Sequence, residues 1–64
     1  MIKITEIIRK RRKFLHLTLA QLGERAEISL RSLKSIENGD GNPTIGQLVK
    51  VLDVLGMQLK VEIK

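Results

Sequence analysis

Residues 18–39, TLAQLGERAEISLRSLKSIENG, constrain the fold more than any other stretch of the chain. They hold two short helical segments, each preceded by a residue that can cap a helix: Thr18 and Ser29. Gln21 follows Thr18 at the spacing of a capping box, and the second segment ends in Gly39, a typical helix stop. Helices this short are not stable alone, so packing against the rest of the chain must hold them.

The apolar residues of this stretch predict how the two segments pack together. The residues expected to join them are Leu22, Ala26, Ile28, Leu33 and Ile36. A glycine inside a helix costs about 1 kcal/mol relative to alanine, so Gly23 suggests that another helix crosses close to it. Two short helices joined by a tight turn form a helix-turn-helix, whose second helix presents its N-terminal side chains to the major groove of DNA.

Further helices are expected on both sides of this pair. Residues 4–15 are predicted to form a helix that Thr5 and Glu6 can start, and a helix capped by Thr44 is predicted to end at Gly56. The apolar stripe of the first is Ile4, Ile7, Ile8 and Leu15, interrupted by Arg11. The stripe of the last is Ile45, Leu48, Val49, Leu52 and Leu55. The prediction is therefore a mainly α domain of four helices over residues 1–56.

Residues 57–64 change the pattern from helical spacing to strict alternation. The apolar positions are Met57, Leu59, Val61 and Ile63. Alternation of this kind predicts a half-buried strand. The sequence holds no second strand candidate, and a lone strand leaves its backbone groups unpaired. We therefore expect a C-terminal dimerisation strand that pairs with its copy across a homodimer; the alternatives are a frayed tail or a strand lying on the helices.

Size and charge narrow the class of partner. The chain has 64 residues, a net charge of +5 and no cysteine, so disulfides and thiolate metal sites are excluded. His16 is the only histidine, so no metal site is expected, and an oligomer is the expected support for so small a domain. An excess of basic over acidic residues favours a polyanionic partner: DNA, RNA or an anionic membrane. Because Phe14 is the only aromatic residue, single-strand and RNA-binding modules are disfavoured.

Other classes of function have little support. The sequence contains no nucleophile–base pair, carboxylate pair or phosphate loop, so we expect no enzyme, no catalytic residue and no cofactor. No apolar run reaches the length of a membrane span, and Arg9 to Lys13 interrupt any signal peptide. The expected location is the cytoplasm, in association with the nucleoid.

The stretches LTLAQLGERAEISLRSLKSIENGDGNPT and IGQLVKVLDVLG resemble the Cro/C1 (XRE) family of bacterial and phage regulators. The resemblance covers residues 4–56, and its most specific part is Ser29-x3-Leu33-x2-Ile36-Glu37-Asn38-Gly39-x3-Pro43. It implies a lambda-repressor-like domain. The final LGMQLKVEIK resembles one branch of that family, the antitoxins that partner HipA-type kinases and end in a dimer-forming strand.

The resemblance implies roles for individual residues. The expected DNA-binding residues are Thr18, Ser29, Leu30, Arg31, Ser32, Lys34, Ser35 and Asn38. Arg12 and Glu37 match a family ion pair that ties the first helix to the end of the third. Arg31 is the expected base reader, with a phosphate clamp or a solvated side chain as alternatives. Lys34 and Ser35 are expected to make phosphate or water-mediated contacts.

The sequence also departs from the family pattern. Leu19 stands where the family usually has Gln, and Leu30 replaces a polar reader, so only moderate specificity is expected. His16 and Glu27 stand where Gly is common, and a left-handed backbone at either costs about 1–2 kcal/mol. For Phe14 three options stay open: a core residue, a contact with the C-terminal ribbon, or a contact with a partner protein.

The predicted function is sequence-specific binding of duplex DNA by a dimeric repressor that reads an inverted repeat. The alternative is an antitoxin that neutralises a HipA-type kinase and regulates its own operon. A third option, in which the first helix lies on a membrane, is disfavoured by the ordered caps after residue 17. The basic run from Arg9 to Lys13 suggests a DNA clamp, but consecutive helical residues point all round the axis, so only two or three can face one partner.

Overall fold

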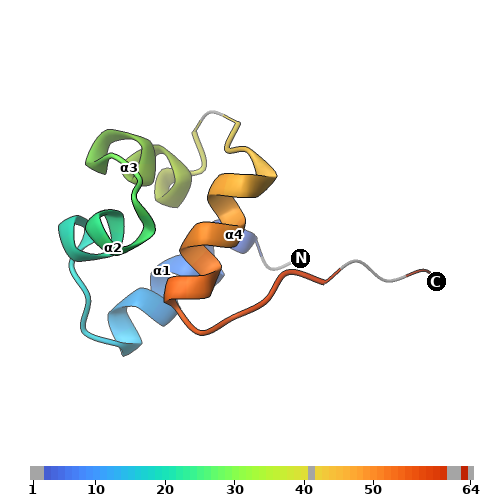
Figure 1. Cartoon of the computed structure of the whole chain (residues 1–64), viewed down its shortest axis with the longest axis horizontal. Helices are drawn as coiled ribbons and strands as arrows, with labels where there is room; N and C mark the ends of the chain where they lie inside the picture. The colour runs from blue at the N-terminus through green and yellow to red at the C-terminus, as the bar shows by residue number, and fades with distance from the viewer. Residues whose placement is uncertain (1–2, 41, 61–62, 64) are drawn as a thin grey trace.

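The protein is represented by a computed structural model that describes residues 3–40, 42–60 and 63. This part of the chain forms four helices, as the sequence predicts. They are α1 (Ile4–Phe14), α2 (Leu19–Ala26), α3 (Leu30–Asn38) and α4 (Ile45–Val54). Helix α2 packs on α3 and α4, and α1 packs on α3 (Figure 1). The mainly α prediction is therefore confirmed.

Three of the helices begin where the sequence places their caps. Thr18 and Thr44 each form a full capping box with the glutamine three residues later. Ser29 accepts a hydrogen bond from the Ser32 amide at 3.2 Å. The caps satisfy amides that have no partner inside a helix, which is why each helix starts at a defined residue.

The start of α1 differs from the prediction. The helix begins at Ile4, and Lys3 is its N-cap without a side-chain hydrogen bond. The Lys3 carbonyl accepts from the amides of Glu6 and Ile7 at 3.0 and 3.2 Å. The predicted start at residue 4 is confirmed, but the role given to Thr5 and Glu6 in starting the helix is wrong, because the Lys3 carbonyl, two residues before Thr5, begins the hydrogen-bond ladder.

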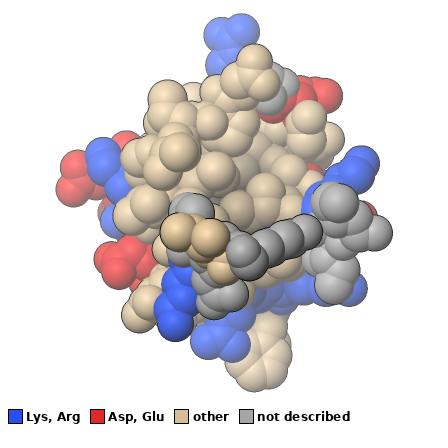
Figure 2. Space-filling view, turned by 90° about the vertical axis from the view of Figure 1, so that its right-hand side faces the viewer, with Lys and Arg blue, Asp and Glu red and all other residues tan. Residues whose placement is uncertain are grey.

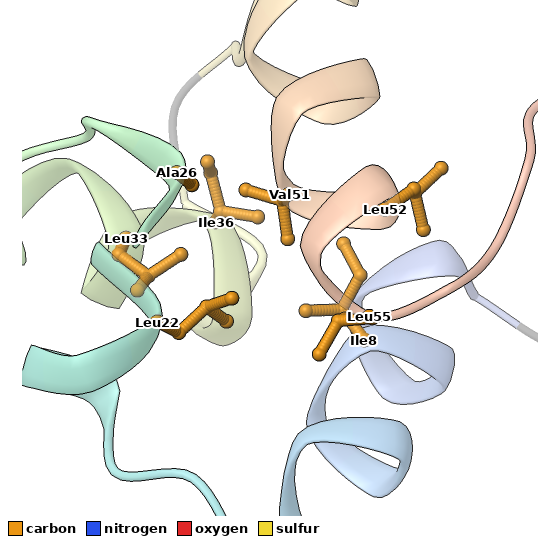
Figure 3. Close-up of a cluster of buried hydrophobic side chains, with 8 residues drawn as sticks. All are labelled: Ile8, Leu22, Ala26, Leu33, Ile36, Val51, Leu52 and Leu55. Carbon is orange, nitrogen blue, oxygen red and sulfur yellow. The ribbon is translucent and has the colours of Figure 1, made fainter. Parts of the chain in front are cut away.

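One apolar core joins the four helices (Figure 3). Its buried residues are Ile8, Leu22, Ala26, Leu33, Ile36, Val51, Leu52 and Leu55. On α4 the structure corrects the predicted stripe, since Val51 is buried while Ile45 and Val49 are 71% and 49% exposed. This helix carries apolar residues around most of its circumference, so spacing alone does not select the face that packs.

The described part of the C-terminal tail forms no strand. Met57 donates its amide to the Leu52 carbonyl at 2.8 Å and packs against the core, which closes the end of α4. Residues 58–60 and 63 have no regular structure, and Val61, Glu62 and Lys64 lie outside the described residues. The expected strand is thus not seen among the described residues, which contain no second strand that could pair with its backbone.

Candidate nucleic-acid interface

The turn between α2 and α3 brings the two helices close together. The Ile28 amide donates to the Gly23 carbonyl at 2.9 Å. A Cβ placed on Gly23 would lie 2.7 Å from the Ile28 carbonyl oxygen, closer than real Cβ contacts come. Glu27 has a left-handed backbone with φ 57°, as does His16 in the preceding turn. The absence of a side chain at Gly23 therefore lets the turn close and sets the direction in which α3 leaves it.

Helix α3 has one buried face and one exposed face. The buried residues are Leu33, Ile36 and Glu37. The exposed face of α3 consists of Leu30, Arg31, Lys34 and Asn38. Ser32 and Ser35 lie at its edge and are half-buried. The structure thus brings six of the eight residues expected at DNA onto this one helix.

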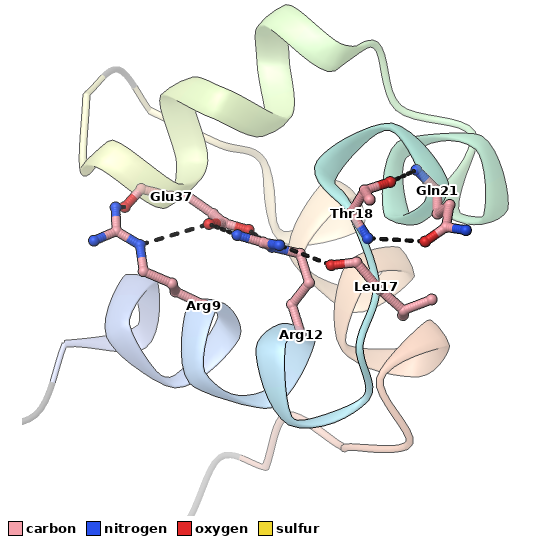
Figure 4. Close-up of polar contacts among 6 residues, drawn as sticks. All are labelled: Arg9, Arg12, Leu17, Thr18, Gln21 and Glu37. Atoms are coloured by element: carbon pink, nitrogen blue, oxygen red, sulfur yellow. Dashed lines mark hydrogen bonds and ion pairs between the residues drawn. The ribbon is translucent and has the colours of Figure 1, made fainter.

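The other two expected DNA residues, Thr18 and Ser29, are exposed but engaged as caps. The Thr18 hydroxyl accepts from the Gln21 amide at 3.0 Å, and the Gln21 side chain accepts from the Thr18 amide at 2.9 Å (Figure 4). The Ser29 and Ser32 hydroxyls lie 3.0 Å apart. These caps fix the N-termini of α2 and α3, where backbone amides and the helix dipole favour negative charge.

The structure also brings Arg12 and Glu37 together. Arg12 Nε lies 2.6 Å from Glu37 Oε2, and Arg12 Nη2 donates to Oε1 at 3.1 Å. The third nitrogen, Nη1, donates to the Leu17 carbonyl at 2.8 Å. One guanidinium therefore joins α1, the α1–α2 turn and the end of α3 (Figure 4). A two-pronged pair of this kind fixes geometry as well as charge.

Arg9 adds a contact that the sequence did not reveal. Its Nη2 donates to the Glu37 backbone carbonyl at 3.0 Å, and its Nε lies 3.6 Å from Glu37 Oε1 (Figure 4). The Glu37 side chain is only 4% exposed, and two cations from successive turns of α1 compensate the burial of its charge. The spacing of Arg9 and Arg12, three residues apart on one helix face, was the available signal.

Arg11 is used inside the molecule as well. Its Nε donates to the Leu55 carbonyl at 3.0 Å, and its guanidinium carbon lies 5.2 Å from the centre of the Phe14 ring. In the basic run, only the side chains of Lys10 and Lys13 make no hydrogen bond or ion pair with the residues that the structure describes. Most of this run therefore holds α1 to the other helices.

A polar groove of about 200 Å³ opens beside the exposed face of α3. It lies between α3 and the start of α4, and Arg31, Ser35 and Gln47 are part of its lining. Asp40 lines it too and places a negative charge near Arg31. Arg31 makes no ion pair within 4.0 Å among the described residues, so its side chain is available to a ligand.

The residues expected to dimerise lie in different environments. Met57 is half-buried against the core, whereas Leu59 and Ile63 are 43% and 100% exposed. Val61 lies outside the described residues. Elsewhere in the described ranges, no group of His, Cys, Asp and Glu is arranged to hold a metal ion, and no helix is long and apolar enough to cross a membrane.

The chain is similar to known proteins over most of its length. A family model described as Helix-turn-helix (HTH_3) matches residues 8–61. The cryptic phage CTXphi transcriptional repressor RstR of Vibrio cholerae serotype O1 (strain ATCC 39315 / El Tor Inaba N16961) is 40% identical over 57 residues, 89% of this chain and 51% of that relative. The chain therefore spans about half the length of this relative.

A solved structure shows the same arrangement of helices. A chain in the complex of the SinR and SinI proteins has a TM-score of 0.81 and 35% sequence identity, over 88% of this chain and 55% of that chain. The turn geometry, the packing of α3 and the family match over residues 8–61 agree. The chain belongs to the helix-turn-helix family of the Cro/C1 (XRE) type.

Proposed function

We propose that this protein binds duplex DNA with sequence preference by placing α3 in the major groove. The observation that carries the proposal is the exposed face of α3, whose polar side chains make no hydrogen bond or ion pair among the described residues, while the opposite face is packed into the core. The major groove is about 12 Å wide and admits one helix. The N-terminus of α2, capped by Thr18, adds a site suited to a phosphate.

The exposed side chains divide into base readers and phosphate contacts. Arg31 can donate two hydrogen bonds to guanine, a contact worth about 1–3 kcal/mol of discrimination. Leu30, 43% exposed, can touch a thymine methyl group but carries no hydrogen-bonding group. Lys34 and Asn38 are proposed to bind phosphates, which add affinity without sequence choice.

The proposed biological role is transcriptional repression. The similar protein RstR is named a transcriptional repressor, and a protein that occupies a promoter blocks access to it. In this role the protein works in the cytoplasm, at the nucleoid. Two copies would place their α3 helices in successive major grooves about 34 Å apart, so the operator is proposed to be an inverted repeat.

The homodimer is proposed from apolar surface that a single chain leaves bare. Ile45 and Val49 on α4 and Leu59 and Ile63 in the tail are all exposed. Figure 2 shows the side where α4 and the tail lie, with a broad uncharged area ringed by charged residues. We propose that residues 1–56 are the DNA-binding domain and that residues 57–64 pair with their copy across the dimer.

Selection from randomised duplex DNA at about 150 mM salt tests the DNA-binding proposal, because this salt suppresses non-specific affinity. We expect an enriched inverted repeat. Arg31→Ala should weaken binding to that repeat by about tenfold or more and random DNA much less, whereas Lys34→Ala should weaken both equally. A folded protein that enriches no sequence would contradict sequence-specific binding.

Leu59→Lys tests the dimer, since it places a charge on the proposed apolar contact. We expect a shift toward monomer in analytical ultracentrifugation, with Gln58→Lys as the control because Gln58 is exposed and lies on the polar side of the alternation. Equal masses for the two variants would contradict the tail as a dimer contact.

The second candidate is the antitoxin role, with a HipA-type kinase as partner. The similar SinR structure is a complex of two proteins, which favours testing a protein partner as well as DNA. Co-expression with a HipA-type kinase, followed by size-exclusion chromatography, distinguishes the two roles. A stable complex would support the antitoxin role, and separate elution of the two proteins would contradict it.

A further inference from the structure

The outer side of α1 carries a stripe that the DNA-binding proposal does not use. Lys3, Ile7, Lys10 and Phe14 recur at the helical spacing of four, three and four residues, so they share one side of the helix. Lys3, Lys10 and Phe14 are exposed and Ile7 is half-buried. Basic and apolar side chains therefore alternate along the outside of the helix.

Phe14 is the most distinctive residue of this stripe. It is the only aromatic residue of the chain, yet its side chain is 70% exposed at the end of α1. The Arg11 guanidinium lies 5.2 Å from the ring centre and is itself anchored to the Leu55 carbonyl at 3.0 Å. This contact favours one orientation of the ring before any partner arrives, which lowers the entropy lost on binding.

We propose that the outer stripe of α1 docks an acidic segment of another protein that also carries an apolar side chain. The exposed side chains of Lys10, one turn before Phe14, and Lys13, the residue before it, make no hydrogen bond or ion pair among the described residues and supply positive charge near the ring. Glu6 is the only acid of α1 and lies two turns before the ring. Aromatic and Arg side chains of this kind dominate the binding energy of protein interfaces.

The observations favour a protein segment over DNA or a membrane. In Figure 1 the C-terminal end of α1 lies at the bottom of the view and α3 at the top, with α2 between them, so this end of α1 is away from the helix proposed to enter the groove. A phosphate backbone makes no use of an exposed ring. A membrane requires a broad apolar face, but Ile4 and Ile8 of α1 pack in or against the core, which leaves only Phe14 and the neighbouring Leu15 exposed at this end of the helix.

The test is selection of a displayed random peptide library on the folded chain. We expect enriched peptides with several Asp or Glu residues beside an aromatic or aliphatic residue. One enriched peptide is then synthesised as a fluorescent probe, and its affinity is measured by anisotropy. Phe14→Ala should weaken this probe by about tenfold or more, the scale of an interface hot spot. Lys10→Gln should weaken it less and reduce its salt dependence.

Ile45→Ala is the matched control, because Ile45 is 71% exposed but lies on α4. It should leave the probe unchanged, and Phe14→Ala should leave affinity for duplex DNA unchanged, which separates this inference from the proposed function. Several outcomes would overturn the inference: no enriched peptide, enriched peptides without acids, or equal affinity for the two alanine variants. Loss of DNA affinity in Phe14→Ala, or Phe14-dependent binding to phosphatidylserine vesicles, would reassign the stripe to those ligands.

Discussion

The two faces of α3 use the same residue types for opposite purposes. The buried face is Leu33, Ile36 and Glu37, and the exposed face is Leu30, Arg31, Lys34 and Asn38. Each face has leucine and charge, but the buried leucine fills the core and the buried carboxylate has partners on α1. One side of these nine residues therefore holds the helix in the fold, and the proposed contact with DNA is assigned to the other side.

This separation makes matched substitutions informative. The same change on the two faces should alter stability on one side and binding on the other. If both faces responded alike, the division of tasks would be wrong.

The largest contrast is expected between Leu33→Ala and Leu30→Ala. Leu33 is fully buried and its truncation leaves a cavity, so it should lower the free energy of unfolding by about 3 kcal/mol. Leu30 is 43% exposed and its truncation should cost less than about 1 kcal/mol. Urea unfolding followed by circular dichroism measures both, and loss of the cooperative transition in Leu33→Ala counts as the same result. Comparable losses would contradict the assigned faces.

The next contrast is between Arg12→Ala and Arg31→Ala. Removing Arg12 leaves Glu37 buried with only Arg9 nearby, which should cost about 2 kcal/mol. The exposed Arg31 side chain makes no hydrogen bond or ion pair among the described residues, so its truncation should change stability by less than about 0.5 kcal/mol. Thermal unfolding of both variants tests the pair. A stable Arg12→Ala protein would show that the bidentate contact adds little to holding α3.

The sequence predicts the buried face well because its signals are local. Caps at Thr18 and Ser29, the stop at Gly39 and the spacing of Leu33 and Ile36 all act within one or two turns, and the structure confirms them. The exposed face follows from the same spacing. Its contacts with DNA are carried only by the family resemblance and remain proposals.

What the sequence did not predict depends on contacts between distant segments. Arg9 and Arg11 each bond a backbone carbonyl, 28 and 44 residues away, and a carbonyl carries no signature of residue type. On α4 the exposed Ile45 and Val49 and the buried Val51 are all apolar, so periodicity did not separate them. The tail alternates like a strand, but pairing depends on a second chain.

Two glycines outside α3, Gly23 in α2 and Gly46 in α4, allow a second matched comparison of a crowded site with an open one. Alanine normally stabilises a helix interior relative to glycine by about 1 kcal/mol. At Gly23 the new Cβ would lie 2.7 Å from the Ile28 carbonyl oxygen, so Gly23→Ala should instead destabilise by about 1–2 kcal/mol. At Gly46 the nearest atom, Thr44 Oγ1, is 3.8 Å away, so Gly46→Ala should stabilise. Urea unfolding should give a lower free energy of unfolding for Gly23→Ala and a higher one for Gly46→Ala. A higher value for both variants would contradict the close approach at Gly23.

The smallest effect is expected at Glu27, in the turn that connects α2 to α3 and sets the direction of α3. Its backbone is left-handed with φ 57°, a conformation that strains residues with a Cβ but suits glycine. Glu27→Gly should therefore stabilise the fold by about 0.5–1 kcal/mol, less than the full strain because glycine loses more entropy on folding. It should leave DNA affinity unchanged, since Glu27 lies outside the exposed face of α3. Glu24→Gly, exposed but inside α2, should destabilise by about 1 kcal/mol and is the control. Differential scanning calorimetry should show a higher melting temperature for Glu27→Gly and a lower one for Glu24→Gly. A less stable Glu27→Gly protein would mean that the glutamate side chain, rather than backbone strain, decides the energy of this turn.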